Sequence, residues 1–299
     1  MNKLILVTGA TGGIGKEYSN FMLAKGFDLV LTYRNKEAGL ALQKDLQEAF
    51  PHAMVDAMMI DLSSMASIQT FADAFSKKYS HLDVLVHNAG VYFFDQEKRI
   101  SKDGFELNMT IHLISPYVLT GLLLPILKAT PHSKIISMSS TEHKASHFDV
   151  STLTRTTPDT TFNNGTAYAD SKFALLVFAQ ELNRLLQKNH LDILSLAAHP
   201  GVSITGIQHK GNPTAFQKMI ISLIGKTLAG SPMDAARPLV MATLTGQGGE
   251  YYGPTGFKEA RGKAGLVSPH PKTKDEQLGH NLWLTLEKLT GISYPFLTS

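Results

Sequence analysis

The first residues of the chain place a short apolar run directly before a cluster of glycines. Residues 3–8 favour a buried strand, a glycine-rich loop occupies residues 9–15, and the following residues, up to about 25, are typical of a helix. Glycines at such a turn allow a tight bend, close approach of backbone N–H groups to a phosphate, and close packing of the helix. The pattern therefore predicts the start of an α/β fold that binds a nucleotide, with a purely structural turn as the alternative.

The glycine spacing does not specify a subfamily by itself. It reads as G-x-x-x-G-x-G through Gly9, Gly13 and Gly15, and equally as G-x-x-G-x-x-G through Gly9, Gly12 and Gly15. Neither reading is the G-x-G-x-x-G of many dinucleotide sites.

Apolar runs and helical patterns alternate along the rest of the chain. Further strands are expected at residues 28–33, 53–60, 81–87, 134–139, 191–198 and 250–252, and helices at 36–50, 65–75, 104–128, 167–187, 232–245 and 273–289. Prolines at 116 and 125 predict bends in the third of these helices. The alternation predicts an α/β, doubly wound (Rossmann-type) parallel sheet of about seven strands with helices on both faces. No linker interrupts residues 1–299, so we expect a single domain, with a variable substrate-loop region at 206–231 whose apolar patch, 219–224, suggests a lid.

Composition excludes several classes of function. The balance of 28 basic against 25 acidic residues is too small to favour nucleic acid or an anionic membrane as a partner. The absence of cysteine excludes disulfides, thiolate catalysis and cysteine-based metal sites. The apolar run at the N-terminus is too short for a signal sequence, and the nearest later one, at 113–127, is interrupted by polar residues, glycine and proline. We expect a cytoplasmic protein without a membrane span.

Polar residues follow three of the expected strands. Arg34 follows the second strand, where an NAD-preferring site would carry an acid, and an arginine can pair with a 2′-phosphate. NADP is therefore predicted over NAD, with an exposed arginine as the alternative. Asp61, after the third strand, caps the next turn or holds an adenine amino group, and the two roles are compatible. Asn88, after the fourth strand, bridges neighbouring strands, contacts the cofactor, or does both.

A tyrosine and a lysine lie four residues apart on the helix expected at 167–187. Tyr168 and Lys172 would share one face of that helix, and a nearby positive charge lowers a tyrosine pKa from its usual value of about 10. Tyr168 is thus a candidate proton donor and acceptor. Ser140, after the fifth strand, reaches the same edge of the sheet. Alone, such a pair is common on solvated helices and such a serine is common in turns.

One pair of histidines has a spacing that could indicate a metal site. His143 and His147 are four residues apart, but they lack a third ligand and the H-E-x-x-H arrangement. We interpret them as solvated loop residues and expect no metal.

Taken together, these segments resemble the short-chain dehydrogenase/reductase family over nearly the whole chain. The matching motifs are TGATGGIG, Asp61-Leu62, Asn88-Ala89-Gly90, Ser139-Ser140, the Y-x-x-S-K of Tyr168 and Lys172, and Pro200-Gly201. Finer motifs resemble its retinol-dehydrogenase and WW-domain-oxidoreductase branch: GIGKE, YRN, DLSSMASI, DGFE, HPGV and YYGPTGF. Members of that branch reduce or oxidise alcohol and carbonyl groups on mostly apolar molecules.

The resemblance implies an NADP-dependent oxidoreductase that transfers hydride between nicotinamide and an alcohol or carbonyl of a mostly apolar small molecule. Tyr168 would be the general acid/base, Lys172 would lower its pKa and hold the nicotinamide ribose, and Ser140 would bind the substrate oxygen. The cofactor would contact Gly9, Thr11, Gly12, Gly13, Ile14, Gly15, Arg34, Asp61, Leu62, Asn88, Ala89, Gly90, Tyr168, Lys172, Pro200, Val202 and Thr205. Members of the family commonly pair through the long helices near 104–128 and 166–189, which implies a homodimer or homotetramer.

One position departs from the pattern of this branch. Nine residues after the aspartate of DGFE the branch carries an asparagine that orders a water linked to the lysine, and counting from Asp103 reaches His112. Asn108 lies a turn earlier and off that register. His112, a candidate catalytic residue, could bind the water, titrate near neutral pH or weaken catalysis. We predict an active enzyme in which His112→Asn retains or increases activity. The alternative is a non-catalytic NADP-binding sensor or scaffold protein.

Overall fold

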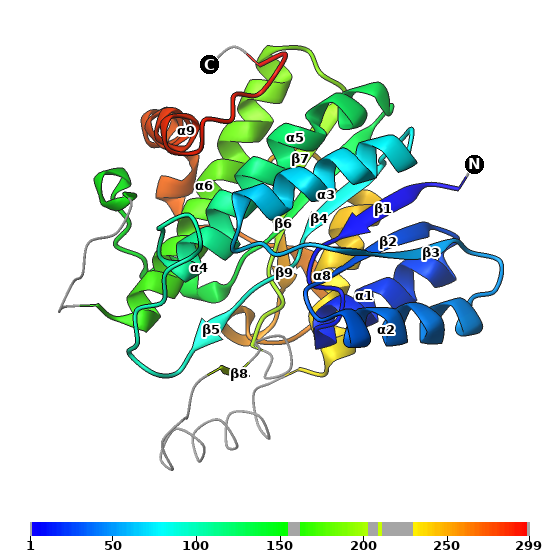
Figure 1. Cartoon of the computed structure of the whole chain (residues 1–299). Helices are drawn as coiled ribbons and strands as arrows, with labels where there is room; N and C mark the ends of the chain where they lie inside the picture. The colour runs from blue at the N-terminus through cyan, green and yellow to red at the C-terminus, as the bar shows by residue number, and fades with distance from the viewer. Residues whose placement is uncertain (1, 155–161, 203–208, 211–229, 298–299) are drawn as a thin grey trace.

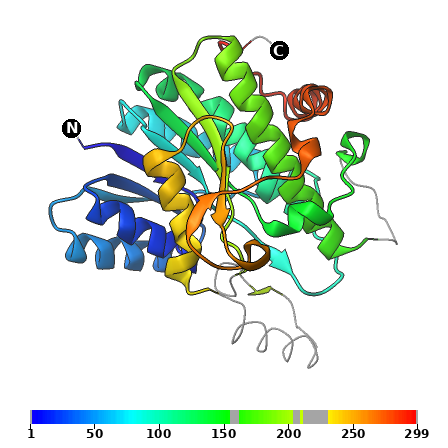
Figure 2. The same ribbon diagram turned by 180° about the vertical axis from the view of Figure 1, so that it is seen from behind.

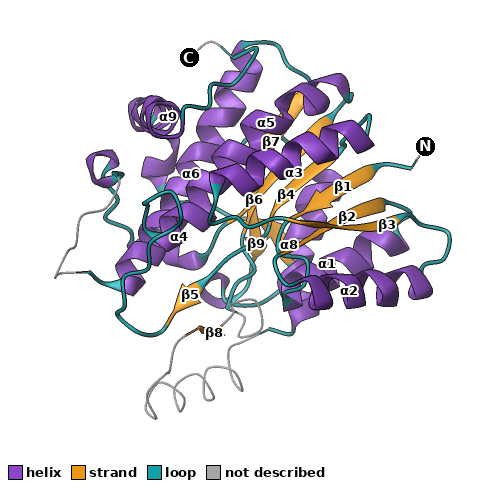
Figure 3. Ribbon diagram, in the orientation of Figure 1, coloured by secondary structure: helices purple, strands orange, loops and turns teal. Residues whose placement is uncertain are grey.

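The chain folds around one eight-stranded sheet. The computed structural model describes residues 2–154, 162–202, 209–210 and 230–297. The strand order is β10-β9-β7-β6-β4-β1-β2-β3 (Figures 1 and 3). The strands are β1 (Leu4–Val7), β2 (Asp28–Tyr33), β3 (Val55–Met59), β4 (Val84–His87), β6 (Ser133–Met138), β7 (Ile193–Ala198), β9 (Tyr251–Pro254) and β10 (Ala264–Leu266).

Seven of these strands are parallel. Only β10, at one edge, pairs antiparallel with its neighbour β9. The predicted doubly wound sheet of about seven strands is therefore confirmed, and the antiparallel edge is an addition to it. β10 is three residues long and carries a central glycine, so it has no alternating pattern from which it could be predicted. A separate pair of two-residue strands, β5 (Tyr92–Phe93) and β8 (His209–Lys210), joins two loops near the cavity described below.

Helices cover both faces of the sheet (Figures 1 and 2). One face carries α3 (Met65–Lys78), α5 (Ser115–Ala129) and α6 (Asn164–Lys188), and the other carries α1 (Gly13–Ala24), α2 (Lys36–Ala49) and α8 (Pro232–Thr245). The short α4 (Leu107–Met109) precedes α5, and α9 (Glu276–Thr290) ends the helical part of the chain.

Two apolar cores lie on opposite sides of the sheet, and strand β1 contributes side chains to both. Leu4 and Leu6 belong to the core under α3, α5 and α6, whereas Ile5 and Val7 belong to the core under α1, α2 and α8. Successive side chains of a strand point to opposite faces, so a strand buried on both faces is apolar at every position. This is why the N-terminal run is continuous rather than alternating.

The helix expected at 104–128 is interrupted. Its first part consists of α4 and a π-helical turn, Thr110–Ile114, and only then does α5 begin. Pro116 lies in the first turn of α5, directly after the π-helical turn, and the backbone before it is already helical. Its missing N–H and its ring therefore disturb that turn, because a proline inside a helix removes a bond to the residue four before it. Single π turns inside helices often accompany functional sites, and this one contains His112.

Within the described part of the chain, one helical stretch is long and apolar enough to cross a membrane. It spans Leu107–Ala129 with a mean hydropathy of 1.7, and 83% of that window is buried inside the fold. Length and composition are weak evidence by themselves, and this burial is what a core helix shows. The absence of a span and the cytoplasmic location stay predictions.

Helix α9 lies against α6 (Figure 1). The ring of Trp283 stacks on Phe178 of α6 with centroids 6.2 Å apart and meets Tyr117 of α5 edge-on at 5.5 Å. The hydroxyl of Tyr294 donates to the carbonyl of Tyr117 at 2.6 Å. α9 and the residues after it therefore cover part of the two helices through which pairing was expected, and the oligomeric state stays a prediction.

Candidate active site

A cavity of about 480 Å³ opens at the carboxyl ends of the parallel strands. The strand order reverses between β1 and β4, and in open α/β sheets this reversal leaves a crevice for ligands. Loops after β1, β2, β3, β4, β6 and β7 line the cavity, together with the first two turns of α6.

Most of the predicted site residues meet in this cavity. It is lined by Gly9, Thr11, Gly12, Ile14, Gly15, Arg34, Asp61, Leu62, Asn88, Ala89, Gly90, Ser140, Tyr168, Lys172, Pro200 and Val202. Gly13 begins α1 and does not line it, and His112 is buried behind it. Thr205 and the patch at 219–224 lie outside the described residues, as does most of the loop region 206–231.

The glycine loop is held too tightly for side chains at two positions. Gly9 has a φ of +67°, and a Cβ there would come within 2.7 Å of the Cα of Ala89. A Cβ on Gly15 would lie 2.5 Å from the carbonyl oxygen of Gly9. The N-terminus of α1 thus packs directly against the loop, and its first turn carries no acidic residue. Backbone N–H groups and the helix dipole at this end favour a phosphate, so the cradle fits a dinucleotide pyrophosphate.

Asn88 bridges β1 and β4, which confirms one of its predicted roles. Its side-chain Nδ2 donates to the carbonyl oxygens of Thr8 at 2.9 Å and Gly9 at 3.2 Å. The Thr8 hydroxyl in turn accepts from the backbone N–H groups of Asn88 and Ala89. These bonds connect the start of the glycine loop to the end of β4.

Arg34 and Asp61 line the same end of the cavity. Arg34 is exposed at the end of β2, with no acid beside it in the sequence. Asp61 accepts from the backbone and the hydroxyl of Ser63, at 3.0 and 2.6 Å, which confirms that it caps its turn. Burial opposes its ionisation, yet hydrogen bonds from Lys102 and Ser63 lower the pKa of Asp61 to about 2. It is therefore a carboxylate at neutral pH.

Ser140, Tyr168 and Lys172 converge at the other end. The side chains of Tyr168 and Ser140 both line the cavity, and Ser140 is near enough to lower the pKa of the tyrosine. Lys172, one turn along α6 on the same face as Tyr168, donates from Nζ to the carbonyl of Met138 at 2.9 Å. All three side chains line the cavity, and those of Tyr168 and Lys172 are buried.

The electrostatics differ from the sequence expectation that Lys172 lowers the tyrosine pKa. Burial raises the pKa of Tyr168 to about 12, against the opposing hydrogen bond from Ser140, and burial lowers the pKa of Lys172 to about 7. The Lys172 nitrogen lies 5.8 Å from the centre of the Tyr168 ring and is bonded elsewhere. Tyr168 is therefore protonated at neutral pH, in the form that donates a proton.

His112 has both ring nitrogens bound. Its Nε2 accepts from the backbone N–H of Val91 at 3.0 Å, so the ring proton is on Nδ1, which lies 2.8 Å from the Ser171 hydroxyl. That hydroxyl donates to the carbonyl of Tyr168 at 2.7 Å. Burial, and then the charge of Lys172, lower the pKa of His112 well below its usual 6.5. Of the roles left open, neither water binding through a ring nitrogen nor titration near neutral pH fits this geometry.

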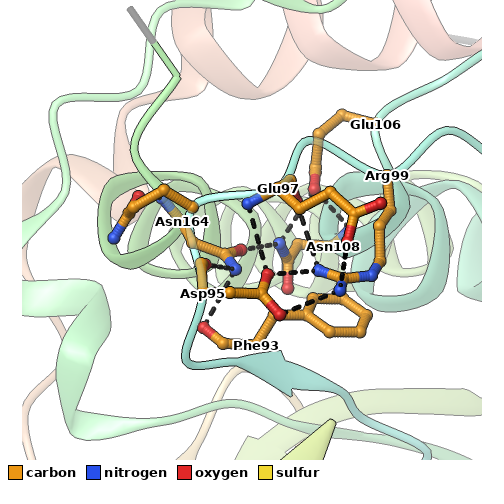
Figure 4. Close-up of polar contacts among 8 residues, drawn as sticks. Phe93, Asp95, Glu97, Arg99, Glu106, Asn108 and Asn164 are labelled. Atoms are coloured by element: carbon orange, nitrogen blue, oxygen red, sulfur yellow. Dashed lines mark hydrogen bonds and ion pairs between the residues drawn. The ribbon is translucent and has the colours of Figure 1, made fainter. Parts of the chain in front are cut away.

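A polar cluster that the sequence did not predict fastens the loop at 92–106 to the start of α6 (Figure 4). Asn164 donates from Nδ2 to the carbonyls of Phe93 and Asp95 at 2.9 and 2.7 Å, and it accepts from Asn108 at 2.9 Å. Arg99 pairs with both carboxylate oxygens of Asp95 at 2.6 and 2.9 Å and lies over the Phe93 ring. The cluster holds Tyr92 and its neighbours next to Tyr168.

His143 and His199 are both buried, which corrects the interpretation of His143 as a solvated loop residue. His143 is fully buried rather than solvated: Nδ1 donates to the carbonyl of Ser140 at 2.5 Å, and Nε2 accepts from the backbone N–H of His270 at 3.1 Å. His199 accepts from the N–H of Gly201 at 3.2 Å. The ring of Tyr251 lies between the two histidines, with centroid distances of 5.6 and 5.2 Å. The HPGV and YYGPTGF motifs thus meet here.

Comparison with known proteins identifies the family. A family model described as short chain dehydrogenase matches residues 3–215. The chain belongs to the short-chain dehydrogenase family. This dehydrogenase is 32% identical over 299 residues to retinol dehydrogenase 13 of Homo sapiens, covering 98% of this chain and 86% of that protein. It is 31% identical over 291 residues to dehydrogenase/reductase SDR family member 13 of Homo sapiens, covering 96% and 73%.

Solved structures agree with this assignment. The crystal structure of an uncharacterized protein from Mycobacterium Paratuberculosis matches with a TM-score of 0.79 and 25% identity, covering 98% of this chain and 95% of that one. The chain is therefore a NAD(P)-dependent dehydrogenase or reductase. The predicted resemblance to the retinol-dehydrogenase branch is confirmed.

Proposed function

We propose that this dehydrogenase is an NADP-dependent oxidoreductase that interconverts an alcohol and a carbonyl group on mostly apolar small molecules, with Tyr168 as the general acid/base. The observation that carries the proposal is one cavity with Ser140, Tyr168 and Lys172 at one end and Arg34 at the other. The glycine cradle lies between these ends and fits the pyrophosphate.

The side chains divide the chemistry between them. The bound nicotinamide supplies or accepts the hydride. The Ser140 hydroxyl holds the substrate oxygen, where negative charge develops during reduction. Tyr168, protonated at neutral pH, donates its proton to that oxygen in reduction and takes it back in oxidation. Lys172 and the turn at Pro200 and Val202 hold the nicotinamide end.

The NADP preference rests on Arg34. An exposed guanidinium at the end of β2, with no acid beside it in the sequence, supports pairing with a 2′-phosphate rather than with a free ribose hydroxyl. We expect Arg34→Ala to weaken NADPH binding by about tenfold or more and to leave NADH binding within about twofold. The matched control is Arg237→Ala on α8, because Arg237 pairs with Asp234 instead. Equal affinity of the wild type for NADPH and NADH would remove the assigned role.

Turnover distinguishes an enzyme from a cofactor-binding sensor or scaffold. NADPH consumption is followed by absorbance against a panel of apolar aldehydes, ketones and quinones. The expected result is turnover of at least one carbonyl class. Tight NADPH binding without turnover on the whole panel would favour the sensor alternative.

A further inference from the structure

Glu142 lines the reacting end of the cavity beside Ser140 and Tyr168. It follows Ser140 by two residues, in the 3-10 helix Thr141–Ala145, and its backbone N–H donates to the Ser140 hydroxyl at 3.2 Å. The side chain is exposed rather than buried in the wall. The backbone bond ties Glu142 to the residue that would hold the substrate oxygen, so a bound substrate would lie close to this carboxylate.

The wall that adjoins Tyr168 here is aromatic. The Tyr92 ring meets Tyr168 edge-on with centroids 5.0 Å apart, and it meets Phe94 edge-on at 5.0 Å. Tyr92, Phe94 and Ile111 all line the cavity. Asn164 donates to the carbonyl of Phe93, the residue between Tyr92 and Phe94 in the sequence (Figure 4). The wall is therefore fixed in place, and it favours an apolar or aromatic substrate body.

Glu142 contributes a negative charge to this apolar end. The other charged residues that line the cavity are Arg34 and Asp61, at the strand ends β2 and β3, and Lys172, which is bonded to the Met138 carbonyl. Within the part of the chain that the structure describes, no ion pair joins a cation to Glu142, whereas Lys144 of the same 3-10 helix pairs with Glu259 at 2.7 Å. Burial is the main reason that the pKa values of Tyr168 and Tyr92 are raised, and the charge of Glu142 raises both further.

We propose that Glu142 is a specificity-determining residue that makes the site select neutral or cationic carbonyl compounds over compounds with a carboxylate near the reacting group. The proposal rests on the proposed function of the same cavity. An anionic substrate would bring a second negative charge beside Glu142 and beside the oxygen on which charge develops. A neutral aromatic substrate would meet the aromatic wall without that repulsion.

The test compares two aldehydes that differ by one charge, benzaldehyde and 4-formylbenzoate, in NADPH-dependent reduction at pH 7.5 and low salt. The readout is the ratio of their kcat/KM values, which is independent of the fraction of active enzyme. Replacing Glu142 by Gln should lower the preference for benzaldehyde by about fivefold, the size of one partly screened charge–charge contact. The matched control is Glu48→Gln, an exposed carboxylate on α2 that pairs only with Lys44 among the ion pairs of the described residues.

The pH dependence of alcohol oxidation gives a second readout that a merely structural role would not move. Oxidation needs ionised Tyr168, so the rate rises with pH, and removing the Glu142 charge should move this rise to lower pH. The other groups that face Tyr168 are the same in both proteins: Ser140, Tyr92, Lys172, His112 and Tyr251.

The outcomes separate the two proposals. A lower preference for benzaldehyde in Glu142→Gln, and not in Glu48→Gln, supports the role of Glu142. An unchanged ratio and pH profile in an active Glu142→Gln enzyme overturns that role and leaves the proposed function intact. If the wild type reduces neither aldehyde and no other carbonyl of the panel with NADPH, the proposed function itself is overturned.

Discussion

Replacing His112 by asparagine tests how the interior of this site is built. The imidazole is buried, neutral and bonded on both sides, to the Val91 N–H and to the Ser171 hydroxyl. An asparagine side chain is shorter. Its amide can still donate to Ser171, but it does not reach the position of Nε2 and so leaves the Val91 N–H without its acceptor.

The size of the effect follows from this one lost bond. An unpaired buried N–H costs about 1–3 kcal/mol, and less where a water enters the vacated polar space. For a chain of this size, a cost of about 1 kcal/mol lowers the melting temperature by about 2 °C. Activity should be retained or increased, because the contact between Tyr168 and Ser140 is untouched and a water beside Lys172 would restore the arrangement that the asparagine of the branch provides.

The assay combines thermal unfolding with NADPH-dependent kcat/KM for an aldehyde substrate. His112→Leu is the contrasting variant: it leaves both the Val91 N–H and the Ser171 hydroxyl without their partner, so we expect a larger loss of stability, about 2–4 kcal/mol, and lower activity. A folded His112→Asn protein without any turnover would refute the reasoning. An inflection near pH 6.5 that is present in the wild-type pH profile and absent from that of His112→Asn would also refute it. A neutral His112 should contribute no inflection there.

Two further predictions concern the whole chain. Below pH 6.5 histidines bind protons in the unfolded state, whereas buried histidines with a lowered pKa stay neutral in the folded state. The free energy of unfolding should therefore fall by about 1 kcal/mol per such histidine between pH 6.5 and 5.5. The histidines are His87, His112 and His143. Urea unfolding at several pH values measures this, and a flat profile would contradict it. The family resemblance implies a dimer or tetramer, so light scattering should give a multiple of the 32.6 kDa chain mass, and a mass near 32.6 kDa would contradict this expectation.

The fold was predictable because its signals are local. Apolar runs buried on both faces, helical periodicities and the glycine loop each depend on a few neighbouring residues, and together they specify a doubly wound sheet. The pair Tyr168 and Lys172 was predictable for the same reason, since helical spacing alone puts both on one face. The antiparallel β10 was missed because its three residues carry no pattern.

The partners of the site residues were not predictable, because they depend on contacts between distant segments. The bonds of His112 go to Val91 and Ser171, 21 and 59 residues away. Asn164 meets Phe93 across 71 residues. The pKa of Tyr168 was expected to fall because Lys172 is near in sequence, but burial, which only the fold reveals, has the larger effect.

The most direct test of the account compares wild type and Tyr168→Phe in NADPH-dependent reduction of one carbonyl substrate, with NADPH affinity measured for both. The substitution removes only the Tyr168 hydroxyl, which lies in the cavity with Ser140. The account predicts that kcat/KM falls by about 10²–10⁴-fold, the usual contribution of a positioned general acid, while NADPH still binds within about threefold. Equal turnover by the two proteins would contradict the assignment of Tyr168 as the proton donor.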